Sequence, residues 1–389
     1  MGKVYILGAG FSKSAGLPLA SELLGELKTF VYRQPKLVSS LGDPQENWEV
    51  FETAASRITE RLLGTPMTAE EFPDLELLLT LMDLYRKLRG GALETAFRFS
   101  SPPAHRAAAY SLLDNVPVDQ FAAAYGKISW LVSDYFRDFI FKTARSESFR
   151  QRCEYIGQFA RDVVQLGDTV ITFNYDTLAE SFLCEARKWL PHDGYGVHLP
   201  LGYEPFGLST LSDLPLPLPE LPASPIKVLK LHGSASWVKN GDTLLLNPDF
   251  LNYLDHRWRH PAIEALVTED DVLKGYVRNM AASPRDLGDG KPAAIIPTYL
   301  KTYAESPYAD LWRAASTALT TAEEVVVIGY SLPKADVAAQ TLLLSVPKSA
   351  PFTVVNPSGK GHYEEVLGRG VVERKQTLET WLASSWDMT

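Results

Sequence analysis

The pattern of hydrophobic and polar positions divides this chain into two kinds of segment. Short apolar runs rich in β-branched residues lie at the start and in the second half, and a long stretch between them has apolar residues at helical spacing. Short runs of this kind indicate buried strands, and the helical spacing predicts amphipathic helices. The predicted strands are Val4–Leu7, Thr169–Phe173, Ile226–Leu231, Ala293–Ile296, Val325–Ile328, Phe352–Val355 and Val371–Glu373.

The stretch over residues 25–166 carries almost no strand signal. Trp48, Phe51 and Ala55 illustrate its helical spacing. Because the stretch is too long for a single crossover helix, we predict that it forms a helical insertion subdomain. Residues 1–24 and 167–389 are predicted to form a Rossmann-like domain with a mixed insertion at about 236–290. The predicted fold class is therefore α/β, a Rossmann-like parallel sheet with a large helical insertion.

The first predicted strand ends in the glycine turn Gly8-Ala9-Gly10, and a helical pattern follows. A strand, a glycine turn and a helix start are typical of a site that holds a dinucleotide pyrophosphate. Gly8 would let the backbone turn tightly, and Gly10 would let it approach the phosphates without a Cβ atom. The dehydrogenase fingerprint requires a glycine where this chain has Lys13. The sequence therefore predicts a nucleotide turn of a different kind.

Polar residues also follow the next two long strands. Asn174-Tyr175-Asp176 comes directly after the second strand, and His232 follows the third. Open α/β sheets bind their ligands at the carboxyl ends of the strands, so these side chains are candidates for chemistry. The alternatives are structural: Asn174 and Asp176 could cap the predicted helix at 177–190, and His232 could be a histidine of the core.

Two later strands end in the same manner. Gly329-Tyr330-Ser331 follows the strand at Val325–Ile328, and Asn356 follows Phe352–Val355. Each match is weak by itself. Five glycine or polar turns at the ends of successive buried strands together predict one nucleotide-binding site.

Composition and charge narrow the class of protein. The chain has 389 residues, of which 22% are charged and 46% hydrophobic, as in an ordinary globular protein. Its net charge of −9 argues against a general binder of nucleic acid or of anionic membranes. Two cysteines cannot form a disulfide scaffold or a four-cysteine zinc site. Without a membrane-spanning run or a signal peptide, the expected location is cytoplasmic.

The ordered set of strand-end turns resembles the sirtuin (silent-information-regulator) family. Gly8-Ala9-Gly10-Phe11-Ser12, with Gly16-Leu17-Pro18, is similar to the first NAD loop of that family. Thr172 to Asp176 resembles its Thr-Gln-Asn-Ile-Asp segment, and Leu231-His232-Gly233 resembles its catalytic-histidine segment. Gly329-Tyr330-Ser331 resembles the later Gly-Thr-Ser loop, and Asn356 the asparagine near the adenosine end.

Two departures from the sirtuin pattern indicate which branch this chain resembles. The protein-deacylating sirtuins carry a zinc ribbon with paired Cys-x-x-Cys, which two cysteines cannot provide. Leu19-Ala20-Ser21 also replaces the usual Asp-Phe-Arg after Pro18. The chain is instead similar to the zinc-free bacterial sirtuin-like proteins of antiviral systems, which hydrolyse NAD on infection. That resemblance implies a homo-oligomer and a separate partner such as a HerA-type ATPase or an Argonaute-like sensor.

The resemblance implies a role for each matched residue. NAD+ would be the substrate, no metal would be needed, and Asn174, Asp176 and His232 would be the catalytic residues. The turn of Gly8, Ala9, Gly10, Phe11 and Ser12 would hold the pyrophosphate, with the adenosine half surrounded by Gly329, Tyr330, Ser331 and Asn356. Three alternatives stay open: an NAD-dependent protein deacylase, a non-catalytic sensor of NAD or ADP-ribose, and a purely structural interaction protein.

Overall fold

The structure is a computed structural model. It describes residues 2–33, 44–63, 78, 128, 131–136, 138–139, 146–189, 193–197, 223–240, 243–246, 291–292, 307–334 and 336–386. The chain divides into two compact units. The first contains Met1–Leu17, Phe136–Ala294 and Thr302–Thr389, and the second contains Pro18–Tyr135 and Ile295–Lys301. The domain boundaries predicted from the sequence stay a prediction.

A six-stranded parallel sheet forms the centre of the first unit. Its strands in chain order are β1 (Val4–Leu7), β2 (Thr169–Thr172), β3 (Lys227–Lys230), β7 (Val325–Ile328), β8 (Phe352–Val355) and β9 (Val372–Arg374). In space the order is β3-β2-β1-β7-β8-β9. The chain thus builds the sheet outward from β1 in one direction and then returns to build it in the other. This order is that of a Rossmann-like fold, and the prediction of an α/β parallel sheet is confirmed.

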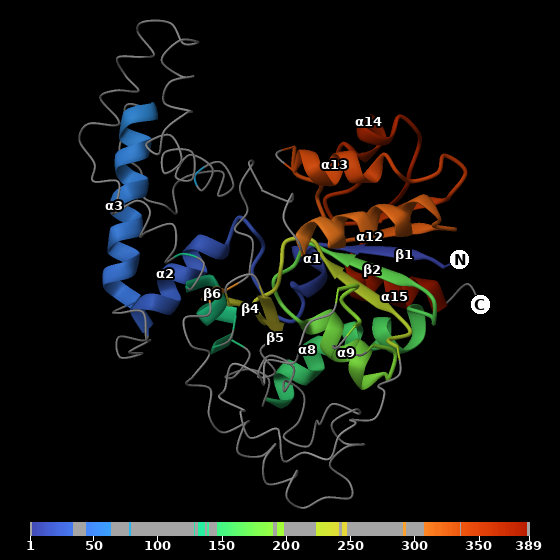
Figure 1. The fold of residues 1–389 in the computed structure, drawn as a ribbon, viewed down its shortest axis with the longest axis horizontal. Helices are drawn as coiled ribbons and strands as arrows, with labels where there is room; N and C mark the ends of the chain where they lie inside the picture. Colours follow the sequence, from blue (N-terminus) through green and yellow to red (C-terminus); the bar gives the residue numbers. More distant parts are fainter. Residues whose placement is uncertain are drawn as a thin grey trace, which may run out of the picture. The chain divides into compact units, whose positions relative to one another are not determined.

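Helices cover both faces of this sheet (Figure 1). One face carries α8 (Glu147–Gln158), the π-helical turn η1 (Phe159–Val163), α9 (Leu178–Glu185) and α15 (Leu378–Trp386). The other carries α12 (Tyr308–Thr320), α13 (Val337–Leu343) and α14 (Tyr363–Leu367). Strands that are covered on both faces are near-continuous apolar runs, and every residue of β1 and of β7 is buried.

The first glycine turn leads into a shorter helix than the sequence pattern indicates. Helix α1 (Ala9–Ser12) begins inside Gly8-Ala9-Gly10 and has only four residues. The apolar positions that follow belong to α2 (Leu23–Arg33), which lies in the second unit. In the same unit, α3 (Pro44–Leu63) confirms the helical pattern of Trp48, Phe51 and Ala55, all three of which are buried.

A small antiparallel sheet lies in the region that the sequence describes only as a mixed insertion. It consists of β4 (Trp237–Asn240), β5 (Thr243–Leu246) and β6 (Lys291–Pro292), in the order β5-β4-β6. β6 ends at Pro292, and the strand predicted at Ala293–Ile296 falls outside the described residues. The sequence did not predict β4 or β5, because their short runs lack the alternation that marks a half-buried strand.

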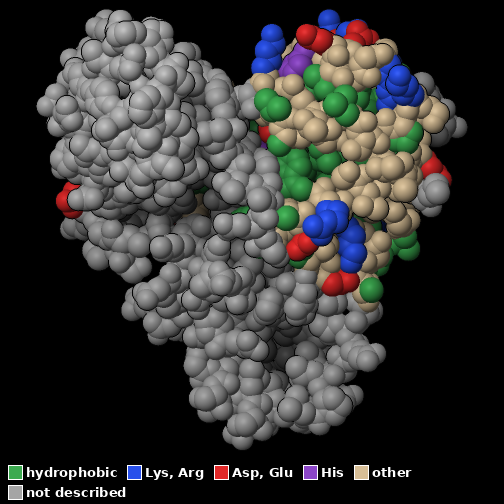
Figure 2. All heavy atoms as spheres, turned by 45° about the horizontal axis from the view of Figure 1, so that its top comes forward, with side chains coloured by type: hydrophobic (Ala, Val, Ile, Leu, Met, Phe, Trp, Pro, Cys, Tyr) green, Lys and Arg blue, Asp and Glu red, His purple; other side chains and the backbone are tan. Residues whose placement is uncertain are grey.

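Charged side chains of both signs are interspersed on the described face shown in Figure 2. Two large hydrophobic side chains are exposed at the ends of α13: Val337, its first residue, and Leu344, which directly follows it. None of the helices that the structure describes combines the length and apolar character needed to cross a membrane.

Candidate functional site

The loops that carry the predicted site residues all begin at one level of the sheet. Leu7 at the end of β1 pairs with Thr172 of β2 and with Ile328 of β7. On either side, Thr172 pairs with Lys230 of β3, and Ile328 pairs with Val355 of β8. The order in which the chain adds strands to this parallel sheet changes direction between β1 and β7. This junction is where open α/β sheets place their ligands.

Three glycines allow the β1 loop and the β7 loop to pack closely against each other at this junction. A Cβ atom at Gly8 would lie 2.5 Å from Cα of Tyr330, and one at Gly10 would lie 2.8 Å from Cα of Gly329. Gly329 has a positive φ of 64°, and a Cβ there would lie 2.3 Å from the amide nitrogen of Phe11. The amide of Gly10 donates to the carbonyl of Gly329 at 2.9 Å.

These distances change the reason for the glycines. Gly8 has an extended backbone with φ −120°, so it supplies space rather than an unusual turn conformation. The missing side chains of Gly8 and Gly10 admit the backbone of residues 329–330, where the sequence interpretation placed phosphates. That interpretation of Gly10 is therefore incomplete: any pyrophosphate has to lie outside this glycine contact.

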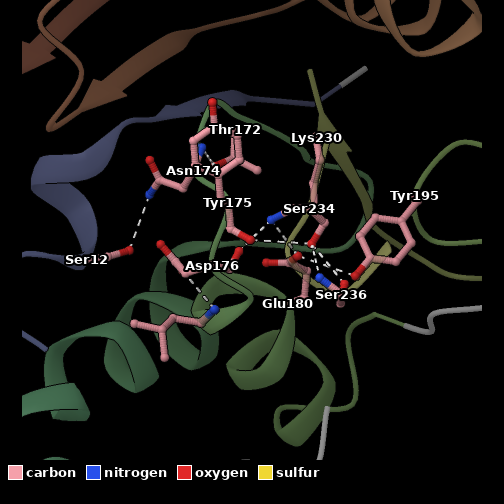
Figure 3. Close-up of polar contacts among 11 residues, drawn as sticks. Ser12, Thr172, Asn174, Tyr175, Asp176, Glu180, Tyr195, Lys230, Ser234 and Ser236 are labelled. Atoms are coloured by element: carbon pink, nitrogen blue, oxygen red, sulfur yellow. Dashed lines mark hydrogen bonds and ion pairs between the residues drawn. The ribbon is translucent and has the colours of Figure 1, made fainter. Parts of the chain in front are cut away.

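Asn174 connects the end of β2 to the loop after β1 (Figure 3). Its Nδ2 atom donates to the carbonyl of Gly8 at 3.0 Å and to Oγ of Ser12 at 3.2 Å. Its own amide donates to Oγ1 of Thr172 at 3.1 Å. The side chain is buried, as is that of Ser12. Asn174 therefore lies directly against the first loop.

Asp176 holds the start of α9. Its Oδ1 atom accepts the amide of Leu178 at 3.0 Å, and its backbone carbonyl accepts Nζ of Lys230 at 2.5 Å. The first contact supports the start of α9 from the residue before its N-cap, Thr177, and is thus close to the capping role that the sequence left open as an alternative. The role of Asp176 beside a nicotinamide ring stays a prediction.

A closed group of polar side chains lies between β3 and α9, and we call it the Lys230 cluster (Figure 3). Its members are Glu180, Tyr195, Lys230, Ser234 and Ser236. Nζ of Lys230 lies 2.9 Å from Oε1 of Glu180, and the two side chains are 0% and 1% exposed. Tyr195 donates its hydroxyl to the same oxygen at 3.4 Å. Burial raises the pKa of Glu180, and the charge of Lys230 only partly offsets this effect.

A second group, the His232 cluster, lies at the ends of β2, β3 and β7. It comprises Phe173, His232, Tyr330 and Asp336. Nε2 of His232 lies 3.3 Å from Oδ2 of Asp336, which also accepts the hydroxyl of Tyr330 at 2.8 Å. The Tyr330 ring stacks on Phe173 with centroids 4.3 Å apart and planes at 12°. The His232 ring meets Phe173 edge-on at 4.9 Å.

The remaining predicted binding residues lie in different surroundings. Phe11 packs its ring inward against Phe159 with centroids 5.2 Å apart. Asn356 supports the β7 loop, because its Nδ2 atom donates to the carbonyl of Tyr330 at 3.5 Å and its Oδ1 atom accepts the amide of Ser358 at 3.0 Å. Ser331 is exposed and Ala9 is partly exposed. Of this set, the side chain of Ser331 is the most exposed to solvent.

The structure brings the predicted residues together in two groups. In the first group, Asn174 hydrogen-bonds the loop of residues 8–12. In the second group, His232 and Tyr330 both contact Asp336, and Phe173 packs against the rings of both.

Sequence reasoning missed Asp336, Lys230 and Glu180. Lys230 is a charged residue between the apolar Leu229 and Leu231 at the buried end of β3, and this is a usable signal for a buried ion pair. Asp336 immediately precedes α13 and gives only the signal of a helix cap.

Within the part of the chain that the structure describes, no group of three or more His, Cys, Asp or Glu side chains could hold a metal ion. Both cysteines are buried as free thiols on α8 and α9. Burial raises the pKa of Cys153 to about 12 and that of Cys184 to about 12.

The sequence matches no protein-family model and no curated protein. Solved structures that resemble the chain include a Sir2 protein in complex with the inhibitor EX-527, 2′-O-acetyl-ADP-ribose and a deacetylated p53 peptide. It shares 11% identity with this chain, with a TM-score of 0.33, over 100% of this chain and 93% of that one. A second sirtuin, from work on sirtuin substrate affinity, shares 12% identity, with a TM-score of 0.33, over 100% and 92% of the two chains. Similarity this low does not establish a family.

Proposed function

We propose that this chain binds NAD+ at the carboxyl edge of its parallel sheet and hydrolyses the bond between nicotinamide and ribose. The observation that carries the proposal is the placement of Asn174. This asparagine lies two residues after the end of β2 and hydrogen-bonds the β1 loop, beside the point where the strand order changes direction. A Rossmann-like sheet binds nucleotides at this point. His232 follows the neighbouring strand, so an amide and an imidazole lie on adjacent loops.

The reaction needs few groups. Water adds its oxygen to C1′ of the ribose, and the C1′–N bond breaks with its electron pair passing to the positively charged nicotinamide ring. One proton of the water is lost to a base, so the products are nicotinamide, ADP-ribose and a proton. Because the C1′ carbon develops positive charge in the transition state, the site must hold the ribose rigidly and stabilise that charge.

Each residue receives a role in this proposal. His232 serves as the general base toward the water or a ribose hydroxyl. Asn174 fixes the ribose hydroxyls or orients the water, and Asp176 binds the nicotinamide carboxamide. The loop of residues 8–12 holds the pyrophosphate from outside the glycine contact. Residues 329–331 and Asn356 surround the adenosine half.

The test follows nicotinamide release from NAD+ by liquid chromatography. We expect His232→Ala and Asn174→Ala each to lower the turnover by about 10²–10⁴-fold, the usual contribution of a positioned acid or base. Thr317→Ala is the control, because Thr317 is an exposed residue of α12 that bonds only its own helix. Turnover near that of the unaltered protein in both site variants would refute the assignment.

A second candidate is a sensor that binds NAD+ or ADP-ribose without consuming it. The burial of His232, which is 5% exposed and packed by Phe173, favours this reading, because a base has to reach water. Calorimetric binding of NAD+ without any release of nicotinamide would support the sensor. A deacylase would instead release nicotinamide only when an acylated peptide is added.

The cellular role that we propose rests on the sequence resemblance alone. In that role the chain is the NAD-depleting effector of a bacterial antiviral system, acts as a homo-oligomer and is triggered by a separate ATPase or Argonaute-like partner. Co-expression with the candidate partner, followed by measurement of cellular NAD+ during phage infection, tests it. Constant NAD+ levels on infection would contradict it.

A further inference from the structure

We propose that Asp336 is a positioning residue that fixes the tautomer of His232, with the proton on Nε2 and the lone pair on Nδ1. The consequence for catalysis rests on the proposed hydrolase function. The tautomer itself does not, because it follows from the contacts of the two side chains.

Both carboxylate oxygens of Asp336 are engaged inside the protein. Oδ1 accepts the amide of Ala339 at 3.3 Å, which makes Asp336 the N-cap of α13. Oδ2 accepts the hydroxyl of Tyr330 at 2.8 Å and lies 3.3 Å from Nε2 of His232. The side chains of His232 and Asp336 are 7% and 2% exposed. Water therefore does not replace these partners freely.

The chemistry of the carboxylate sets the tautomer. An ionised carboxylate only accepts hydrogen bonds, so the imidazole nitrogen that faces it must carry a proton. In a neutral imidazole the second nitrogen, Nδ1, then holds the lone pair that a general base needs. The hydroxyl of Tyr330 donates to the same oxygen and keeps the carboxylate in place, while the stacked Phe173 and Tyr330 rings restrict movement of the whole group.

Helix capping alone would explain the position of Asp336, and Asp336→Asn separates the two roles. Asparagine caps helices as well as aspartate does. It has only one side-chain oxygen, however. If that oxygen keeps the amide of Ala339, the NH₂ group faces Nε2 of His232. Nε2 must then accept a hydrogen bond, so the proton moves to Nδ1 and the base is lost.

The experiment measures the tautomer by nitrogen-15 NMR of the full chain with labelled histidine, at a pH about two units above the ordinary imidazole pKa. The chain has seven histidines, and the resonances of His232 are assigned by their loss in His232→Gln. We expect the Nε2–H form in the unaltered protein and a shift to the Nδ1–H form in Asp336→Asn. The matched control is Asp310→Asn at the start of α12, where the carboxylate pairs with exposed Arg313. This variant should leave the resonances of His232 unchanged.

Several outcomes would overturn the proposal. An Nδ1–H form in the unaltered protein would overturn it without any variant, and so would an Nε2–H form that stays unchanged in both Asp336→Asn and Asp336→Ser. If Asp336→Asn does not fold, Asp336→Ser is the substitute. It retains a hydroxyl that can cap α13 and removes the carboxylate oxygen that faces Nε2 of His232. We expect it to give a mixture of tautomers. An unchanged Nε2–H form in Asp336→Ser would then overturn the proposal by itself.

Activity measurements separate this proposal from the proposed function. If the protein hydrolyses NAD+, we expect Asp336→Asn to lower kcat by about 10²–10⁴-fold with little change in KM, because the base is lost while the contacts to NAD+ remain. A shift of the tautomer in a protein that releases no nicotinamide would refute the hydrolase and leave Asp336 as the positioning residue.

Discussion

Lys230 and His232 lie two residues apart in the chain, yet the clusters around them differ in location and in chemistry. Lys230 extends toward α9 on one face of the sheet, whereas His232 contacts Asp336 at the start of α13, a helix of the opposite face (Figure 1). The first cluster pairs a lysine with a glutamate in complete burial, and Lys230 also donates to the carbonyl of Asp176. The second pairs an imidazole with a carboxylate. The Lys230 cluster therefore fixes the backbone at Asp176, and the His232 cluster sets which imidazole nitrogen of His232 carries the proton.

The largest effect is expected from breaking the Lys230 cluster. Lys230→Met leaves the buried carboxylate of Glu180 without its cation and the carbonyl of Asp176 without its donor. Removing one partner of a buried ion pair costs about 3–5 kcal/mol. We therefore expect the free energy of unfolding to fall by about that amount, as measured by denaturant titration.

The double variant Lys230→Met with Glu180→Leu is the control for this prediction. Replacing both charges of a buried pair by apolar groups is often neutral or stabilising. We expect the double variant to recover most of the lost stability, apart from the hydrogen bonds that Tyr195 makes to Glu180 and Lys230 makes to the carbonyl of Asp176. A single variant that loses less than about 1 kcal/mol would contradict the picture of a desolvated pair.

A smaller effect is expected in the His232 cluster. Tyr330→Phe keeps the ring that stacks on Phe173 and removes only the hydroxyl that donates to Asp336. His232 and the amide of Ala339 still face that carboxylate. We expect a loss of about 1–2 kcal/mol in the same denaturant titration. A loss as large as that of Lys230→Met would contradict this expectation, because it would mean that the Asp336 carboxylate depends on the Tyr330 hydroxyl as strongly as Glu180 depends on Lys230.

Most of the central sheet could be predicted from the sequence. The bounds of β1, β7 and β8 match the predicted runs, because strands covered on both faces read as continuous apolar segments. Their parallel order also places all the predicted turns at one edge. The four-residue length of α1 could not be predicted, since the apolar periodicity after it belongs to α2 in another unit.

The candidate site could be predicted only in part. Asn174 and His232 stand out because polar residues directly follow apolar strands. Their contacts do not, because each depends on tertiary packing between segments distant in sequence. Nothing near His232 in the chain indicates that it meets Asp336 of another loop, and nothing near Lys230 indicates Glu180 on α9. Spacing along the chain cannot encode which face of the sheet a turn residue takes.

The smallest effect concerns the two cysteines, which report whether the two clusters open independently. Cys184 lies on α9, the helix that carries Glu180, and Cys153 lies on α8, which packs against α9. Burial raises the pKa of Cys184 to about 12. At a pH about four units lower, only about one thiol in 10⁴ is ionised, and thiolate is the reactive form. In the folded protein both thiols should therefore react with a disulfide reagent only as fast as the α8–α9 face opens.

The same thiols then give the sharpest test of the comparison. Lys230→Met should speed the labelling of Cys184, because it weakens the contact between α9 and β3. Tyr330→Phe should leave the labelling rate at that of the unaltered protein, because its lost hydrogen bond lies at the start of α13 on the other face. If Tyr330→Phe accelerates labelling as much as Lys230→Met does, the two clusters open as one cooperative unit. The two clusters would then lie on opposite faces of the sheet without being independent in stability.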